Sequence, residues 1–278
     1  MEKKVLVIDV GGTFIKYGLI DEECQLTKTS KIKTPYESQE HFFKTLQNIY
    51  LSYRNENIQG IAMSVPGKID IEKGVMLTSG ALVYLEGLEL AEKLSALCDH
   101  LPVSVENDGK AAALCESWVG QAKDCQSCVV FIFGSGVGGG IVMNHQVLRG
   151  LDLIAGEFSP VFVDLHQGNY QSFAGEYSTL AVVKKIQNMK EDENIDGEQM
   201  MQLYRQQDEE VVVVLEDWFD AIAKFCYNID CIMNPECFCI GGGISQDPLF
   251  VEKIQEKIDE IFTKAYLFRK PQVKTGQY

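Results

Sequence analysis

Residues 7–20 read VIDVGGTFIKYGLI and residues 130–143 read VFIFGSGVGGGIVM, and these two stretches decide the fold. Each has an apolar, β-branched run on either side of a glycine turn, which is typical of a β-hairpin. A third strand follows each hairpin, so each stretch opens an antiparallel meander. The repetition predicts an internal duplication, in which two lobes share one architecture although their turns differ in side chains.

The remaining segments alternate between strand and helix patterns, which predicts an α/β fold with a mixed sheet flanked by helices in each lobe. We expect strands at 58–65, 103–106 and 236–245, and helices at 40–53, 85–98, from 108, at 174–188, 197–206, 208–233 and 248–264. We place the first lobe at 1–107, joined by the C-terminal helix near 252–278, and the second lobe at 108–251.

The composition limits the possible partners. The chain has 278 residues, enough for two cores, and its 25 basic and 40 acidic residues give a formal net charge of −15. This charge disfavours nucleic acid and anionic lipid as partners. No apolar run approaches the roughly 20 residues of a membrane helix, and MEKKVLVIDVGG lacks the features of a signal peptide. We therefore expect a cytoplasmic protein that is not bound to membranes.

Nine cysteines are scattered through the chain, and only Cys125 and Cys128 form a CxxC pair. A zinc site needs a second pair or histidines at ligand spacing. Cys237 and Cys239 alternate along a strand-like run, so both are expected on one face of a sheet. This pattern favours reduced structural thiols over metal ligands.

The first glycine turn lies in the run from Asp9 to Lys16. Gly11 and Gly12 let the backbone approach an anion closely and present N–H groups to phosphate oxygens, while Thr13 adds a hydroxyl and Lys16 a positive charge. Asp9 ends a strand and could hold magnesium through water. An ordinary hairpin explains the same residues, because glycine turns between strands are common.

Two further glycine turns follow apolar strands. The second contains Gly134, Ser135 and Gly136, and the third consists of Gly241, Gly242 and Gly243. Eight of the chain's 24 glycines lie in residues 134–140 and 241–243, which loop flexibility alone does not explain. Neither is a Walker A loop or a dinucleotide fingerprint. Three strand-to-glycine turns together suggest a nucleotide held between two similar lobes.

The segment ENDGKAAA carries Asn107 and Asp108 at a strand-to-helix junction. Either side chain suits a helix N-cap. A carboxylate at such a rigid point also suits a general base. The two roles are compatible.

Six motifs in order resemble the ROK family of sugar kinases, within the actin-like ATPase superfamily. They are DVGGTFIKYGLID, VPGKID, ENDGKAAALCE, FGSGVGGGIVMN, LRG followed by AGE, and NPECFCIGGGIS, and they span residues 5 to about 250. The resemblance implies a two-lobed, ribonuclease H-like fold with the sugar in a cleft between lobes. It also implies that the first two glycine turns clamp the ATP phosphates and that the third lies against the adenosine.

The same resemblance implies residue roles. Asp9 would organise magnesium, Thr13 and Lys16 would face the phosphates, and Asp108 would deprotonate the attacking hydroxyl. The sugar contacts implied are Gly67 of VPGKID, Asn107, Glu157 of the AGE motif and Glu176. Acceptor-only carboxylates suit a polyol, although either glutamate could instead be an ordinary surface residue.

The sequence departs from the family at one place. Many members follow AGE with Gly-His and then a CxCGxxGC cluster, which together bind a structural zinc ion. Here Pro160 occupies the histidine position, no cysteine lies between 161 and 176, and His166 alone cannot build a tetrahedral site. We expect no zinc site. Because the lost histidine also contacts sugar in the family, glucose, N-acetylmannosamine and a β-glucoside all stay open as substrates.

We therefore predict an ATP- and magnesium-dependent sugar kinase, whose lobes close around the substrate and exclude water. The resemblance suggests a homodimer. The alternative is a catalytically silent sugar-binding regulator or interaction protein of the same fold.

Overall fold

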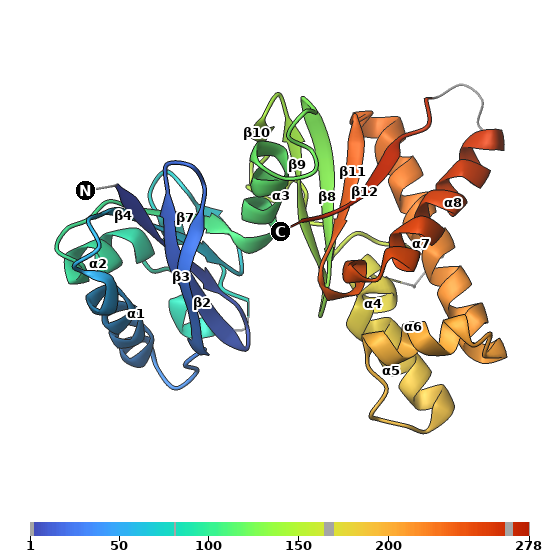
Figure 1. Ribbon diagram of the computed structural model, residues 1–278, viewed down its shortest axis with the longest axis horizontal. Coiled ribbons are helices and arrows are strands. Elements are labelled where there is room, and N and C mark those ends of the chain that lie inside the picture. Colours follow the sequence, from blue (N-terminus) through green and yellow to red (C-terminus); the bar gives the residue numbers. More distant parts are fainter. Residues whose placement is uncertain (1–2, 81, 164–169, 265–268, 278) are drawn as a thin grey trace. The chain divides into compact units, whose positions relative to one another are not determined.

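The computed structural model describes residues 3–80, 82–163, 170–264 and 269–277. The chain divides into two compact units, Met1–Ala111 and Ala112–Tyr278, each built on a five-stranded mixed sheet with helices (Figure 1). This confirms the predicted α/β fold class with its duplicated architecture. The division falls four residues after the predicted boundary at 107/108, because the first turn of the helix at Asp108 stays with the first unit.

The first unit contains the sheet β3-β2-β1-β4-β7. The predicted meander consists of three antiparallel strands, β1 (Lys4–Val10), β2 (Phe14–Asp21) and β3 (Leu26–Lys33). Two strands parallel to β1 extend the sheet on its other side, β4 (Ile58–Val65) and β7 (Val103–Asn107). Its helices are α1 (Gln39–Tyr53) and α2 (Leu90–Leu97), and its short elements are β5 (Ile69–Asp70), β6 (Val75–Met76) and η1 (Val83–Leu85). The core packs Phe42 and Leu46 of α1 with Leu6 and Ile8 of β1.

The second unit repeats this strand order as β10-β9-β8-β11-β12. Its strands are β8 (Ser127–Phe133), β9 (Val137–Met143), β10 (Gln146–Val147), β11 (Cys237–Gly241) and β12 (Gln272–Thr275). Its helical elements are α4 (Phe173–Tyr177), α5 (Thr179–Lys190), α6 (Gly197–Arg205), α7 (Glu209–Met233), η2 (Gly243–Gln246) and α8 (Pro248–Lys264), while α3 (Asp108–Trp118) begins in the first unit. In each sheet a three-stranded meander is followed by two parallel strands, which is the predicted duplication.

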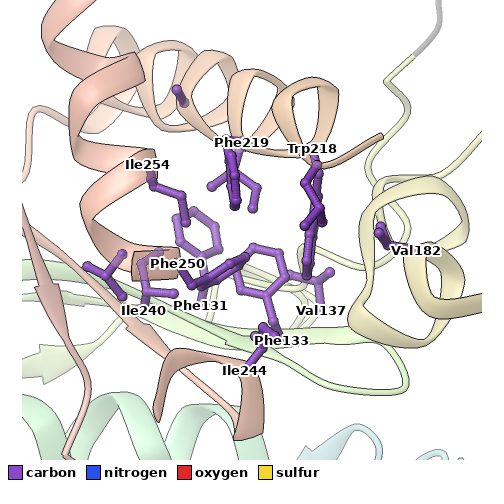
Figure 2. Close-up of a cluster of buried hydrophobic side chains, with 14 of the residues drawn as sticks. Phe131, Phe133, Val137, Val182, Trp218, Phe219, Ile240, Ile244, Phe250 and Ile254 are labelled. Carbon is purple, nitrogen blue, oxygen red and sulfur yellow. The ribbon is translucent and has the colours of Figure 1, made fainter. Parts of the chain in front are cut away.

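An aromatic core lies between the second sheet and its helices (Figure 2). Phe133 of β8 contacts Trp218 of α7 and Phe250 of α8, with ring centroids 6.1 and 5.9 Å apart. The Trp218 indole N–H donates to the Tyr177 carbonyl at 2.7 Å, so its polar atom is satisfied despite burial. This core fixes β8, the strand that leads into the second glycine turn.

Three predicted elements need correction. The helix expected at 174–188 is split at Ser178, whose hydroxyl accepts from the Ala181 N–H at 3.2 Å and so caps α5. The helix expected at 85–98 begins only at Leu90, after a turn in which Gly87 has φ +78°. The C-terminal segment does not join the first unit, because α8 packs on α7 and β12 pairs in parallel with β11.

Within the described ranges, no helix combines the length and apolar character that crossing a membrane requires.

Asp208 caps α7 and provides a test of local stability. Its carboxylate accepts from the Val211 N–H at 3.2 Å and pairs with Lys190 at 2.8 Å, and these contacts lower its pKa, the lysine first. Because the pKa of Asp208 is lower in the folded protein than in the unfolded chain, its carboxylate stabilises the fold at every pH above the pKa of the unfolded chain. This stabilisation is lost as the pH falls through the pKa of the folded protein. We expect Asp208→Ala to lower the Tm at pH 7 by roughly 2–4 °C.

The Asp208→Asn variant is the matched control, because asparagine still caps a helix but carries no charge. Its Tm should lie between those of wild type and Asp208→Ala. Thermal melts followed by circular dichroism at pH 7 and pH 3 measure both effects. If the difference between wild type and Asp208→Ala were as large at pH 3 as at pH 7, the ionised carboxylate would not be its cause.

Candidate active site

One edge of the first sheet gathers half of the predicted site residues. Strands β1, β4 and β7 are parallel, with Asp9 in register with Ser64 and Val65 in register with Asn107. Their carboxyl ends therefore lie side by side. Because neighbouring strands are about 4.8 Å apart, the ends of β1 and β7 are separated by about 10 Å.

Asp9 is held from two sides. The Ser64 hydroxyl donates to Oδ1 of Asp9 at 2.8 Å, and Nζ of Lys16 lies 3.7 Å from Oδ2. The side chains of Lys16 and Asp9 are 69% and 46% exposed, so both remain open to a solute. A half-exposed carboxylate of this kind fits magnesium, which keeps several waters and uses one or two protein carboxylates plus phosphate oxygens.

Sequence reasoning missed Ser64. The apolar pattern of 58–65 predicted β4 but not its neighbours, and the parallel register that places Ser64 beside Asp9 is a long-range pairing. The signal available was its position, one residue before the end of a strand that stops at Pro66-Gly67.

The first glycine turn is anchored by its carbonyl groups. The Thr34 hydroxyl donates to the Gly11 carbonyl at 2.6 Å, the Thr34 N–H donates to the Thr13 carbonyl at 3.0 Å, and the Tyr36 hydroxyl donates to the Gly12 carbonyl. The N–H groups of Gly12 and Thr13 meet no protein acceptor among the residues that the structure describes. The turn therefore has fixed carbonyls and available donors, as an anion site requires.

Asn107 and Asp108 form a hydrogen-bonded unit at the start of α3. Oδ1 of Asn107 accepts from the Lys110 N–H at 3.0 Å, which makes Asn107 the helix cap. Its Nδ2 donates to the Gly67 carbonyl and to Oδ1 of Asp108, both at 3.0 Å, and the same oxygen accepts from the Gly109 N–H at 2.8 Å. Asn107 is buried whereas Asp108 is exposed, so the cap positions a carboxylate that solutes can reach.

Gly67 is required by backbone geometry. It has φ +105°, and a Cβ there would lie 2.3 Å from the Thr78 carbonyl oxygen. Its own carbonyl holds Asn107. The structure thus brings Gly67 to Asn107 and Asp108.

The second and third glycine turns lie together at one edge of the second sheet, because β8 and β11 are parallel neighbours with Gly241 in register with Ile132. The Gly134 carbonyl accepts from the Leu180 N–H at 3.1 Å, and the Gly134 N–H donates to the Gly136 carbonyl at 3.0 Å. Gly134 and Ser135 are exposed. This turn, like the first, is held by its carbonyl and presented to solvent.

Gly242 places the third turn against the second. It has φ +95°, and a Cβ there would lie 2.1 Å from the Phe133 carbonyl oxygen. Gly243 then begins η2, and the Ser245 N–H donates to the Gly242 carbonyl at 3.1 Å.

The segment around the AGE motif approaches the second turn through Ser159, which the sequence did not single out. Its hydroxyl accepts from the Val137 N–H at 3.0 Å, and its carbonyl accepts from the Ala174 N–H at 3.2 Å. Glu157 is partly buried two residues earlier, and Glu176 is exposed on α4. Their predicted common role in binding sugar stays a prediction.

The absence of a zinc site in this region also stays a prediction. Among the described side chains, no group of three or more His, Cys, Asp and Glu residues is arranged to hold a metal ion. Pro160 is exposed, and His166 lies outside the described residues.

Comparison with known proteins identifies the family. The ROK family model matches residues 5–275. The chain belongs to the ROK family. Among ROK relatives, a β-glucoside kinase of Listeria monocytogenes is 29% identical over 92% of this chain and 88% of its own length. An N-acetyl-D-glucosamine kinase of Vibrio atlanticus is 27% identical over 90% and 87%.

A solved ROK structure agrees with the fold. The ROK family protein from Streptococcus pneumoniae TIGR4, crystallised in complex with sucrose, matches with a TM-score of 0.90 and 25% identity. The match covers 99% of this chain and 93% of that protein. The resemblance inferred from six sequence motifs is therefore confirmed over nearly the whole chain.

Proposed function

We propose that this protein transfers the γ-phosphoryl group of ATP to a sugar hydroxyl, with Asp108 as the general base. The observation that carries the proposal is the Asp108 carboxylate, exposed at the start of α3 and held by the Asn107 amide and the Gly109 N–H. It lies on the strand edge that also carries Asp9 and the first glycine turn. Similarity to named sugar kinases supports the reaction class.

Asp108 would accept the proton of the attacking hydroxyl as the bond to phosphorus forms. Phosphoryl transfer depends mainly on positioning and charge stabilisation, so a rigidly held carboxylate meets the protein's main chemical need. Asn107 was predicted to contact a sugar hydroxyl. Its amide N–H groups already donate to Gly67 and Asp108, so any sugar contact would use the remaining acceptor capacity of its Oδ1.

The phosphates of ATP would bind to the turn at Gly11, Gly12 and Thr13 and to Lys16, whose exposed ammonium lies beside Asp9. The turn at Gly134, Ser135 and Gly136 would also bind phosphate oxygens, and Gly241 to Gly243 would lie against the adenosine. Asp9 would hold magnesium through water. When bound, magnesium neutralises charge on the phosphate oxygens.

The substrate is proposed as a hexose, an N-acetylhexosamine or a β-glucoside, with Glu157 and Glu176 accepting from its hydroxyl groups. The named relatives include kinases of a β-glucoside and of N-acetyl-D-glucosamine, and one solved relative contains sucrose. Pro160 stands where many members have a sugar-binding histidine, so nothing favours free glucose over the other two classes of substrate.

Sugar-dependent ADP release, measured over glucose, N-acetylglucosamine, N-acetylmannosamine and aryl β-glucosides, tests this proposal. We expect at least one sugar to raise ADP formation well above the sugar-free rate. Calorimetric titration with the same sugars separates the alternative, because a silent sugar-binding protein would bind a sugar without ADP release. That outcome would overturn the proposal.

A further inference from the structure

Four thiols gather in a small core of the second unit. They come from the turn before β8, from β8 itself and from β11: Cys125, Cys128, Cys237 and Cys239. Cys237 and Cys239 both belong to this cluster, which confirms that they share one face of the sheet. Cys237 is in register with Cys128 on the neighbouring strand.

Two of these thiols are in direct contact. Sγ of Cys125 and Sγ of Cys237 are 3.4 Å apart. Nζ of Lys274, on β12, lies 3.9 Å from Sγ of Cys125 and donates to the Gln121 carbonyl at 2.9 Å. The pair therefore has a neighbouring cation, which favours the thiolate over the thiol.

The surroundings separate the two thiols chemically. The Cys239 thiol, then the Cys125 thiol and the Lys274 cation, lower the pKa of Cys237 to about 6 against the opposing effect of burial. Burial, together with the Cys237 thiol, raises the pKa of Cys125 to about 11. These opposite directions favour the thiolate at Cys237 and the thiol at Cys125.

Access to the pair is through the turn that carries Cys125. Cys237 is 1% exposed and Cys125 is 9% exposed. Gln121, Lys123, Asp124 and Gln126 around Cys125 are all exposed. The turn is at the surface, so its local opening would expose both thiols to a small oxidant.

We propose that Cys125 and Cys237 are a peroxide-oxidised thiol pair that closes to a reversible disulfide. The Cys237 thiolate attacks one peroxide oxygen, the O–O bond breaks, and the second oxygen leaves as water after taking a proton. The resulting sulfenic acid is attacked by the Cys125 sulfur, which loses its proton, and the sulfenic oxygen leaves as a second water. Two thiols and one peroxide become one disulfide and two waters.

The test uses the full-length, fully reduced protein and one to a few equivalents of hydrogen peroxide, followed by alkylation of the remaining thiols, proteolysis and mass spectrometry. We expect a disulfide between the peptides that contain Cys125 and Cys237, and its loss on treatment with dithiothreitol. Cys125→Ser and Cys237→Ser should each abolish this linkage. Cys231→Ser is the matched control, because Cys231 is an exposed thiol outside the cluster and its replacement should leave the linkage unchanged.

The wild-type protein alone can overturn the proposal. If Cys125 and Cys237 were both recovered alkylated after peroxide treatment, or Cys237 only as sulfinic acid, the pair would be two packed thiols. Linkage that persists in either serine variant would assign the disulfide to other cysteines. Circular dichroism of each variant identifies any loss of fold.

Discussion

The Asp108→Asn variant is expected to lose about 10²- to 10⁴-fold in kcat for sugar phosphorylation, with much smaller changes in KM for sugar and ATP. Asparagine keeps the shape of the side chain but cannot accept the proton of the attacking hydroxyl. The α3 cap should survive, because the Lys110 N–H donates to Asn107 and not to Asp108. Steady-state kinetics measured by coupled ADP detection give both constants.

Asp217→Asn is the matched control for this substitution. Asp217 is an exposed carboxylate on α7, so its replacement removes the same charge at a position without a proposed role. Its kcat should equal that of wild type, and the Tm of both variants should stay near the wild-type value. Retention of kcat within tenfold in Asp108→Asn would remove Asp108 from the role of base.

A second large effect is expected for Gly242→Ala, on stability. At φ +95° and ψ 169° Gly242 lies in a region that is nearly exclusive to glycine, and an added Cβ would meet the Phe133 carbonyl oxygen at 2.1 Å. The edge of β8 or the whole third turn would have to shift. We expect a loss of about 3 kcal/mol or more in the free energy of unfolding, more than strain alone would cost.

Gly243→Ala is the control, because a Cβ at Gly243 would meet no atom within 4 Å and its φ is not in the left-handed range. Urea unfolding followed by the fluorescence of Trp218, which is buried in the second core, compares the two variants. Gly243→Ala should stay within about 0.5 kcal/mol of wild type. Equal midpoints for both variants would show that the turn adapts to a side chain and that Gly242 is not constrained.

The two sheets were predictable where their signals are local. In each meander the two strands of the hairpin are joined by a short glycine turn. The apolar runs and the glycines between them therefore predicted both strands together. β12 was missed because QVKT is short, has only one apolar residue and pairs in parallel with β11, from which it is separated by the whole of α8. Its pairing also explains why the C-terminal segment belongs to the second unit.

The sequence predicted the residues of the candidate site but not the residues that hold them in place. Asp9, the glycine turns and the Asn107-Asp108 pair lie at the carboxyl ends of strands and so stand out in the sequence. The residues that hold them in place do not stand out. Ser64, Thr34 and Ser159 each bond to a residue 22 to 55 positions away along the sequence. At ENDG the cap is Asn107, and the role of the exposed Asp108 beside it as the base stays a prediction.

The central claim is that the γ-phosphoryl group of ATP is transferred to a sugar hydroxyl by this protein. The most direct measurement uses ATP labelled at the γ-phosphate, the sugar panel and magnesium, with separation of sugar phosphate from inorganic phosphate. The account predicts labelled sugar phosphate in one-to-one ratio with ADP for at least one sugar, and its near absence with Asp108→Asn. Label found only in ATP or in inorganic phosphate, for every sugar, would contradict the account.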